Sequence, residues 1–395
     1  MTEDSDPTKA AVAQRVQDAR ELLESISRDL HANPETAYEE VRSASVLADH
    51  LRQARYAVQP GIGGLPTAFH ATRGSGPLNV CIAAEYDALP GLGHACGHNL
   101  IAAAAVGAAI GLGPVADELG LTVHVLGTPA EEGGGGKIAL LDAGAFDGID
   151  LAMMVHPGPA DSVHARPRAV AHWTVEYAGK TAHAGAFPHL GVNAADAFTV
   201  AQVAIGLLRQ QLPSHVRVHG VVLESGTAAN AIPDRARGRW YVRASTLAEL
   251  EGVADSVRRC FEAGALATGC TMELTLDSPP YSEFVNDPGL LASFAANADA
   301  LGRDMDVDER ASGGMNTAST DMGNVSLQIP SIHPYLSVDC PGIVNHQLEF
   351  AAATLAPAGD RMILDGATAM AWTVVDAARA RTNPSPDRTQ ERDTA

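Results

Sequence analysis

The stretch LNVCIAAEYDALPGLGHACGHNL, Leu78–Leu100, decides which fold this sequence adopts. Its first seven residues form a continuous apolar run, which predicts a strand that is buried on both faces. A polar loop follows this run, and an alanine-rich helix is expected from about Asn99. A strand, a loop and a helix make half of a βαβ unit, and in open α/β sheets a site lies outside the carboxyl ends of the strands. We therefore expect an α/β fold with a site directly after this strand.

The loop of this stretch carries three potential metal ligands. His94, Cys96 and His98 stand at every second position, between glycines. Because alternate side chains of an extended backbone leave the same side, Cys96 and His98 can point at one object. A thiolate and an imidazole together suit zinc or a similar transition metal. Two other interpretations remain open here: a core cysteine beside a loop histidine, and a thiol hydrolase with Cys96 as nucleophile and His98 as base.

Two further apolar runs predict strands that also end in polar residues. They are Leu121–Leu126 and Leu151–Val155. The three strands together deliver the following polar groups at their carboxyl ends: Glu85 and Asp87, Glu131 and Glu132, and His156. A single histidine or glutamate at a strand end can be chance, but three strands in succession indicate a site.

The acid pair Glu131–Glu132 stands before four glycines, which allow the backbone to approach a site closely. Two neighbouring acids in a hydrolytic site can divide labour, one binding metal and one moving protons, although paired surface carboxylates are usually only solvated. The glycines and Lys137 also resemble a phosphate-binding loop. Ile138 stands where that loop needs a serine or threonine to hold magnesium, so we reject a nucleotide site.

Composition excludes several classes of protein. The 395 residues are too many for one ordinary core and carry a formal net charge of −20, which argues against nucleic acid as a partner. Five widely spread cysteines are no disulfide framework, and the acidic start predicts no signal peptide. The apolar run Leu100–Leu112 is too short to span a bilayer. We expect a cytoplasmic protein without membrane or nucleic-acid partners.

The middle of the chain predicts a self-contained module of about 110 residues. Strands and helices are expected there in the order βαββαβ, the split ferredoxin-like arrangement, at 169–177, 192–212, 216–223, 237–244, 247–265 and 271–276. Before it, amphipathic helices are expected over 10–30 and 39–55. The predicted organisation is a two-domain α/β protein: a mixed-sheet catalytic domain from 1–167 and 283–383, an inserted lid and dimerisation domain at 168–282, and a disordered tail at 384–395.

With these motifs in hand, the chain resembles the metal-dependent aminoacylase/carboxypeptidase amidohydrolase (zinc peptidase) family. Within it, the branch of aminobenzoyl-glutamate hydrolase and the aminoacylase-1-like dipeptidases is most similar. The matching stretches cover nearly the whole chain in family order: LHANPETAYEE (Leu30–Glu40), AEYDALPGLGHACGHNLI (Ala84–Ile101), GTPAEEGGGGK (Gly127–Lys137), GKTAHAG (Gly179–Gly185), TAANAIPD (Thr227–Asp234) and ASTDMGNVS (Ala318–Ser326).

The resemblance implies a role for particular residues. Two divalent ions, zinc or manganese, would be held by Cys96, His98, Glu132, His156 and His346. Glu131 would be the general base and acid, and His183 would polarise the scissile carbonyl from the partner subunit, since the family's inserted module usually dimerises. Asn230 and Arg243, thirteen apart in two facing strands, would clamp the substrate's carboxylate.

The chain departs from many relatives at one strand. They have His and Asp where this chain has Ala83 and Glu85. Whether Glu85 or Asp87 hydrogen-bonds to a metal ligand, without itself touching the metal, therefore stays open. Taken singly, His156, His183 and His346 have ordinary explanations as core or loop histidines, and Arg243 as a surface residue of a strand.

The predicted function is hydrolysis of an amide bond beside a free carboxylate, by a metal-bound hydroxide with Glu131 as base. The expected substrates are small molecules, namely N-acyl amino acids, dipeptides or aminobenzoyl-glutamate, and the expected assembly is a homodimer. The alternative is a catalytically inactive metal-binding scaffold of the same fold. The presence of both Glu131 and Glu132 argues against that alternative.

Overall fold

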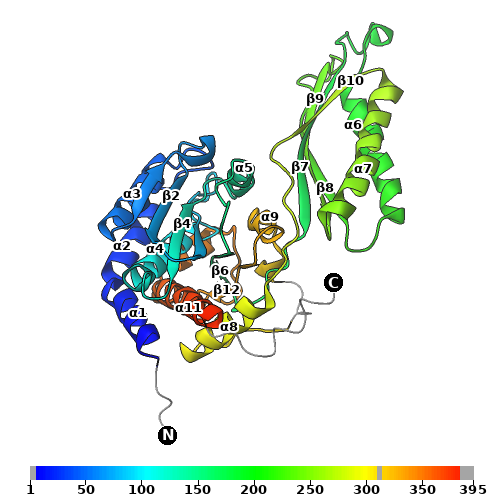
Figure 1. Cartoon of the computed structure of the whole chain (residues 1–395). Coiled ribbons are helices and arrows are strands. Elements are labelled where there is room, and N and C mark those ends of the chain that lie inside the picture. The colour runs from blue at the N-terminus through cyan, green and yellow to red at the C-terminus, as the bar shows by residue number, and fades with distance from the viewer. Residues whose placement is uncertain (1–5, 309–313, 383–395) are drawn as a thin grey trace, which may run out of the picture. The chain divides into compact units, whose positions relative to one another are not determined.

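The computed structural model describes residues 6–308 and 314–382, which form two compact units (Figure 1). One unit is Met1–Arg166 with Phe284–Ala395, and the other is Pro167–Glu283. The predicted tail at 384–395 lies outside the described residues. The single helix expected over 10–30 is wrong: the chain turns at Ala19, which separates two helices, α1 (Pro7–Asp18) and α2 (Arg20–Ala32).

A six-stranded mixed sheet organises the first unit. Its strand order is β1-β2-β4-β3-β5-β11. The four strands from β4 to β11 run parallel, and β1 and β2 are antiparallel additions at one edge. The strand bounds are β1 (Ala57–Pro60), β2 (Phe69–Gly74), β3 (Leu78–Ala84), β4 (Leu121–Gly127), β5 (Leu151–Met153) and β11 (Ser331–Ile332).

Strand β3 is buried on both faces, as its apolar run predicts. Val80 and Ile82 belong to the larger hydrophobic cluster, whereas the alternate residues Cys81 and Ala83 belong to a second cluster on the other face. The two clusters explain why every residue of this strand from Val80 to its end at Ala84 is apolar.

Helix α4 (His98–Leu112) is the central helix of the larger cluster. It packs on β3 and β4 and against α1, α2 and α11. The window His98–Val115 is long and apolar enough to cross a membrane, yet 89% of it is buried inside the protein. The remaining helices and short strands of this unit are α3 (Val41–Gln53), α5 (Gly136–Asp142), β6 (His156–Gly158), α8 (Pro288–Ala300), α9 (Met322–Ser326), β12 (Tyr335–Ser337), α10 (Leu348–Ala353) and α11 (Pro357–Thr382), with short 3-10 turns between some of them.

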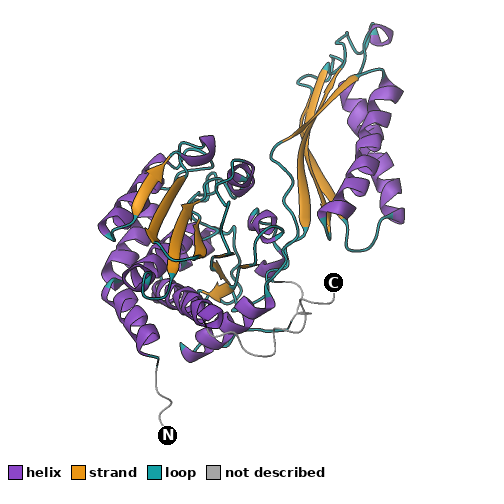
Figure 2. Ribbon diagram, in the orientation of Figure 1, coloured by secondary structure: helices purple, strands orange, loops and turns teal. Residues whose placement is uncertain are grey.

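The second unit has the βαββαβ order expected from the sequence. Its antiparallel sheet has the order β10-β7-β9-β8, and both helices lie on one face of it (Figure 2). Large aromatic side chains fill the space between sheet and helices, among them Trp173, Tyr177 and Phe261. The elements are β7 (Ala169–Ala178), α6 (Ala194–Leu208), β8 (Arg217–Ser225), β9 (Arg235–Ala244), α7 (Leu247–Thr268) and β10 (Thr271–Leu276).

Candidate functional site

The carboxyl ends of the parallel strands bring together the polar groups that follow them. Three overlapping groups of side chains have ligand atoms within 4.8 Å of one another. They are Cys96, His98 and His156; Cys96, Glu132 and His346; and His98, Glu131 and Glu132. The structure thus gathers all five predicted ligands and the predicted base into one cluster, which we call the ligand cluster.

The Asp87 carboxylate orients two members of this cluster. Its Oδ1 lies 2.9 Å from Nδ1 of His98, and its Oδ2 accepts a hydrogen bond of 3.0 Å from the backbone N–H of Glu132. Burial alone would raise the pKa of Asp87, but the charge and hydrogen bond of His98 lower it, so Asp87 is ionised. Although burial lowers it, Asp87 in turn raises the pKa of His98 well above its usual value. Nδ1 of His98 donates to Asp87, and Nε2 points into the cluster, where a bound metal ion would take the place of its proton.

His156 is oriented in the same way by a backbone carbonyl. Its Nδ1 donates to the carbonyl of Pro157 at 2.7 Å, which directs Nε2 toward Sγ of Cys96 at 3.6 Å. Burial holds the pKa of His156 well below its usual value, so the ring is neutral. Burial, together with Glu132, also raises the pKa of the Cys96 thiol, which disfavours a free thiolate nucleophile and weakens the thiol-hydrolase interpretation.

His346 closes the cluster from a distant part of the chain. Its Nε2 lies 3.4 Å from Oε1 of Glu132, and half of its side chain is exposed. Its backbone is left-handed, with φ 70°, and its N–H donates to the carbonyl of Ala95 at 2.8 Å. The preceding Asn345 donates to the carbonyls of Cys96 and Pro157, so the segment is fixed to the loops that carry the other ligands.

Glu131 lies on the inner side of the cluster, with only 7% of its surface exposed. Burial raises its pKa well above the usual value, and the neighbouring carboxylates of Glu85 and Glu132 raise it further. Its carboxylate is within 4.8 Å of those of Glu85 and Asp321. A carboxyl group with a raised pKa takes up a proton more readily than an ordinary glutamate, which is what a general base requires.

Lys137 forms a buried ion triad that sequence reasoning missed. Its Nζ lies 2.5 Å from Oε1 of Glu85 and 2.7 Å from Oδ1 of Asp321, and all three side chains are fully buried. The Lys137 backbone N–H also donates to Asp321. The triad answers the question about the two acids: Asp87 hydrogen-bonds to His98, whereas Glu85 pairs with Lys137 and lies 3.5 Å from His98 Nε2.

His333 was also missed. It follows β11 directly, as the other polar groups follow their strands, but a strand of two residues leaves no periodic signal in the sequence. Its side chain is fully buried, its ring centre is 5.4 Å from that of His156, and neither ring nitrogen has a hydrogen-bond partner among the described residues. Burial lowers its pKa to about 4.

The ligand cluster fits a pair of divalent cations. Two of its buried atoms, Nε2 of His98 and Oε1 of Glu132, have no hydrogen-bond partner among the described residues. Such atoms need an explanation, and a bound ion supplies one. The donors are one thiol, three imidazoles and one carboxylate, a set typical of zinc and neighbouring metals.

In the second unit, His183 and Asn230 lie on adjoining loops. The exposed His183 accepts hydrogen bonds at Nδ1 from the backbone N–H groups of Gly185 and Ala186. Its proton is therefore on Nε2, which leaves one outward-facing donor. The carbonyl of Asn230 accepts from the N–H of Ala184 at 2.9 Å, which joins the two loops.

Arg243 lies far from these loops, which corrects one expectation. Asn230 is not on a strand but in the loop between β8 and β9, before Arg235, and Arg243 is near the opposite end of β9. At about 3.3 Å per residue, the strand separates Arg235 from Arg243 by roughly 26 Å. The statement that Asn230 and Arg243 share facing strands is therefore wrong, and one copy of this unit cannot close both on one carboxylate.

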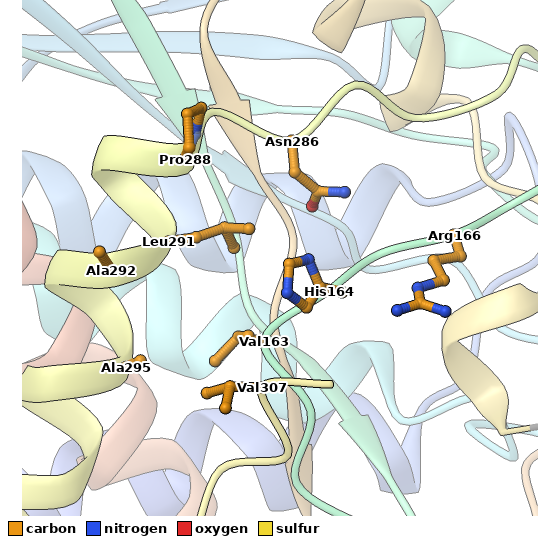
Figure 3. A pocket seen from close by; sticks show the side chains of 9 residues that line it. All are labelled: Val163, His164, Arg166, Asn286, Pro288, Leu291, Ala292, Ala295 and Val307. Carbon is orange, nitrogen blue, oxygen red and sulfur yellow. The ribbon is translucent and has the colours of Figure 1, made fainter. Parts of the chain in front are cut away.

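A separate cavity of about 570 Å³ lies in the first unit beside α8 (Figure 3). Its walls are mostly apolar, with His164, Arg166 and Asn286 at the polar side. None of the residues that line it belongs to the ligand cluster.

Comparison with known proteins gives evidence that is independent of the geometry of the ligand cluster. The model of the peptidase family M20/M25/M40 matches residues 81–359. The mouse Xaa-Arg dipeptidase is 39% identical over 93% of this chain and 88% of its own length. The p-aminobenzoyl-glutamate hydrolase of Escherichia coli K12 has a subunit that is 33% identical over 65% of this chain and 58% of its own length.

A solved structure shows that the fold is shared. It is a Bacillus subtilis protein described as a dinuclear metal binding peptidase from the M20 family, with a TM-score of 0.68 and 23% identity. The match covers 92% of this chain and 99% of that one.

The buried ion triad of Lys137, Glu85 and Asp321 should contribute to the stability of the fold. Lys137→Met should lower the free energy of unfolding by about 3–5 kcal/mol, because two buried carboxylates lose their cation. The folded variant would then hold more protons on Glu85 and Asp321 than the unfolded chain. Its stability should therefore fall as pH rises, and its deficit relative to wild type should be larger at about pH 8 than at about pH 5.

Urea unfolding of both proteins at each pH measures this difference. Lys180→Met, at an exposed position in the second unit, is the matched control and should change little. An equal loss for the two variants would contradict the role given to the triad.

Proposed function

This chain belongs to the peptidase family M20/M25/M40, and on that basis we propose that the ligand cluster is a dinuclear metal centre that hydrolyses the amide bond of a dipeptide or a related N-acyl amino acid. The class of reaction follows from the family and from relatives that are named as a dipeptidase and a hydrolase. The observation that carries the proposal is the convergence of Cys96, His98, Glu132, His156 and His346 beside Glu131.

The five predicted ligands of the ligand cluster would hold two ions, which we propose to be zinc or manganese. The Nε2 atoms of His98 and His156, oriented by Asp87 and the Pro157 carbonyl, support this assignment. When bound, the ions supply Lewis-acid polarisation of the carbonyl and a lowered pKa for the attacking water. The buried thiol of Cys96 favours zinc over harder cations such as magnesium.

Glu131 would move the proton. Its neighbours raise its pKa, so it can accept a proton from the attacking water and return it to the leaving amine within one turnover. We assign Glu132 to metal binding instead, because its Oε1 lies 3.4 Å from Nε2 of His346 and 3.8 Å from Nε2 of His98. The two adjacent acids would therefore have different roles, as the sequence suggests.

The second unit would complete the site in a homodimer. Exposed apolar side chains of α6 and of the edge strand β8 support a second copy of the chain as partner: Val203 and Leu207 are 60% and 70% exposed, and Val221 and Leu223 are 53% and 54% exposed. His183 of one copy would donate its Nε2–H to the scissile carbonyl bound by the other copy. Since Asn230 lies in the loop before β9 and Arg243 near the far end of β9, they would reach one carboxylate only from different copies.

For the substrate, we propose a dipeptide with a free carboxyl terminus, and a basic second residue is the first choice. The mouse relative is named an Xaa-Arg dipeptidase. A net charge of −20 would also favour the approach of a cationic substrate. The competing interpretation, a catalytically inactive metal-binding scaffold, gains no support from a site that carries both Glu131 and Glu132.

The direct test combines metal analysis with an activity panel. Metal content per chain is measured by mass spectrometry on fresh protein, and hydrolysis of Xaa-Arg dipeptides, other dipeptides, N-acyl amino acids and aminobenzoyl-glutamate is assayed before and after chelation. We expect two ions per chain and chelator-sensitive release of a free amino acid, fastest from the Xaa-Arg dipeptides. Full activity without metal would contradict the proposed mechanism, and metal without hydrolysis would favour the scaffold.

Glu131→Gln should lower kcat by about 10²–10⁴-fold while the metal content stays at the wild-type value, because the amide cannot take the proton. Glu132→Gln is the matched control, since it changes the same atoms one residue further on. That variant should lose metal as well as activity. If Glu131→Gln turned over substrate like wild type, the base would be another residue.

Mixed dimers test whether His183 acts across the subunit boundary. Glu131→Gln and His183→Ala are each expected to be nearly inactive alone. Co-expression should restore about a quarter of the wild-type activity, because half of the dimers are mixed and each mixed dimer has one complete site. No recovery in isolated mixed dimers would place His183 in the site of its own chain.

A further inference from the structure

One buried carboxyl oxygen joins two left-handed residues that are far apart in the sequence. Oε1 of Glu40 accepts hydrogen bonds of 2.9 Å from the backbone N–H groups of both Tyr38 and Ala130. Tyr38 has φ 64° and Ala130 has φ 59°. The Glu40 side chain is fully buried. A left-handed conformation costs a residue other than glycine about 1–2 kcal/mol, so each of these residues needs contacts that hold it there.

Ala130 matters because it directly precedes Glu131 and Glu132. Its carbonyl accepts hydrogen bonds from the N–H groups of Gly134 and Gly135, which close the backbone of the acid pair into a tight turn. The hydroxyl of Tyr38 donates to the carbonyl of Gly134 at 2.8 Å. The direction in which the two acids leave the backbone is thus set by the conformation of Ala130, and segment 35–40 holds that conformation from outside.

The same segment also holds the loop that carries Asp87. The N–H of Ala88 donates to the carbonyl of Glu35 at 2.8 Å, and Thr36 forms a parallel bridge with Ala88. The Glu35 carboxylate in turn accepts from the backbone N–H groups of Arg42 and Ser43 at the start of α3. Segment 35–40 is therefore anchored to a helix and bonded to both loops that place the cluster's acids.

We propose that Glu40 is a positioning residue for the hydrolysis: its Oε1 holds Ala130 in the left-handed conformation that aims Glu131 and Glu132 at the ligand cluster. This inference rests on the proposed function for its kinetic test, and a second test is independent of activity.

The hydrogen-bond acceptor, and not the charge, is the feature that matters. Burial raises the pKa of Glu40 to about 7. A glutamine keeps an acceptor oxygen at the same reach, so Glu40→Gln should keep a kcat close to wild type. Glu40→Ala removes the acceptor, and Glu40→Asp withdraws it by one methylene group. Both should lower kcat by about 100-fold with a smaller change in KM, since a misplacement of about 1 Å can cost that factor.

Glu39→Ala is the matched control, because it removes the neighbouring exposed carboxylate and should leave kcat unchanged. If Glu40→Ala folds poorly, the kcat of Glu40→Asp alone decides the test. The inference is overturned if wild type hydrolyses the substrate and Glu40→Asp does so equally well. Absence of hydrolysis by the wild-type protein would instead overturn the proposed function.

A double-mutant comparison separates positioning from general support of the fold. Glycine adopts the left-handed conformation without a steric penalty, so in an Ala130→Gly background the loss of Glu40 should matter less. We expect the ratio of kcat before and after Glu40→Ala to shrink at least several-fold in that background. An equal ratio in both backgrounds would mean that Glu40 acts on the site by another route than Ala130.

Hydrogen exchange gives a readout without metal or substrate. In chelated protein, the peptide that spans residues 127–137 should exchange its amides faster in Glu40→Ala than in wild type, because the N–H of Ala130 loses its acceptor. Glu40→Gln and Glu39→Ala should match wild type. Unchanged exchange in Glu40→Ala would overturn the inference even if the protein proved not to be a hydrolase.

Discussion

The Asp87 carboxylate is the contact on which the geometry of the site depends. It is 1% exposed and joins the ends of two neighbouring parallel strands, because it follows β3 and bonds the backbone of Glu132, which follows β4. The same carboxylate fixes the tautomer of His98 at the start of α4. One side chain thus sets the spacing of Glu132 and His98, two of the predicted ligands. The parallel register of β3 and β4 is what brings both within its reach.

The site also concentrates acidic side chains in a largely buried place. Five acids gather at the strand ends: Glu85, Asp87, Glu131, Glu132 and Asp321. Lys137 and His98 provide the nearby positive charge, and Lys137 is already shared between Glu85 and Asp321. Burial of a charge without a counter-charge is costly, so the remaining acids favour additional cations. Two bound divalent cations would supply the positive charge that balances these carboxylates.

The sequence predicts the parts of the fold that depend on local pattern. The apolar runs locate β3, β4 and β5, and the residues after them are those that converge. Contacts between residues that are far apart in the sequence cannot be predicted in this way. Nothing in the sequence around Lys137 indicates that its partners are 52 and 184 residues away. The break at Ala19 carries no helix-stop residue, and the placement of Asn230 on a strand came from the family resemblance, since the strands predicted at 216–223 and 237–244 do not include it.

Strained backbone conformations occur close to the ligand cluster. Among the residues that the structure describes, left-handed conformations outside glycine occur at Tyr38, Arg55, Ala130, Asp339 and His346. Three of these, Tyr38, Ala130 and His346, carry or brace the ligand cluster. Strained residues persist only where their surroundings over-determine them, and here each has backbone bonds to a second segment or a buried carboxyl group. The strain at these three residues is offset by hydrogen bonds that also hold the reactive groups in place. We therefore expect such a centre to tolerate exchange of exposed neighbours such as Glu39, whereas loss of the buried acceptor of Glu40 would displace Glu131 and Glu132 together.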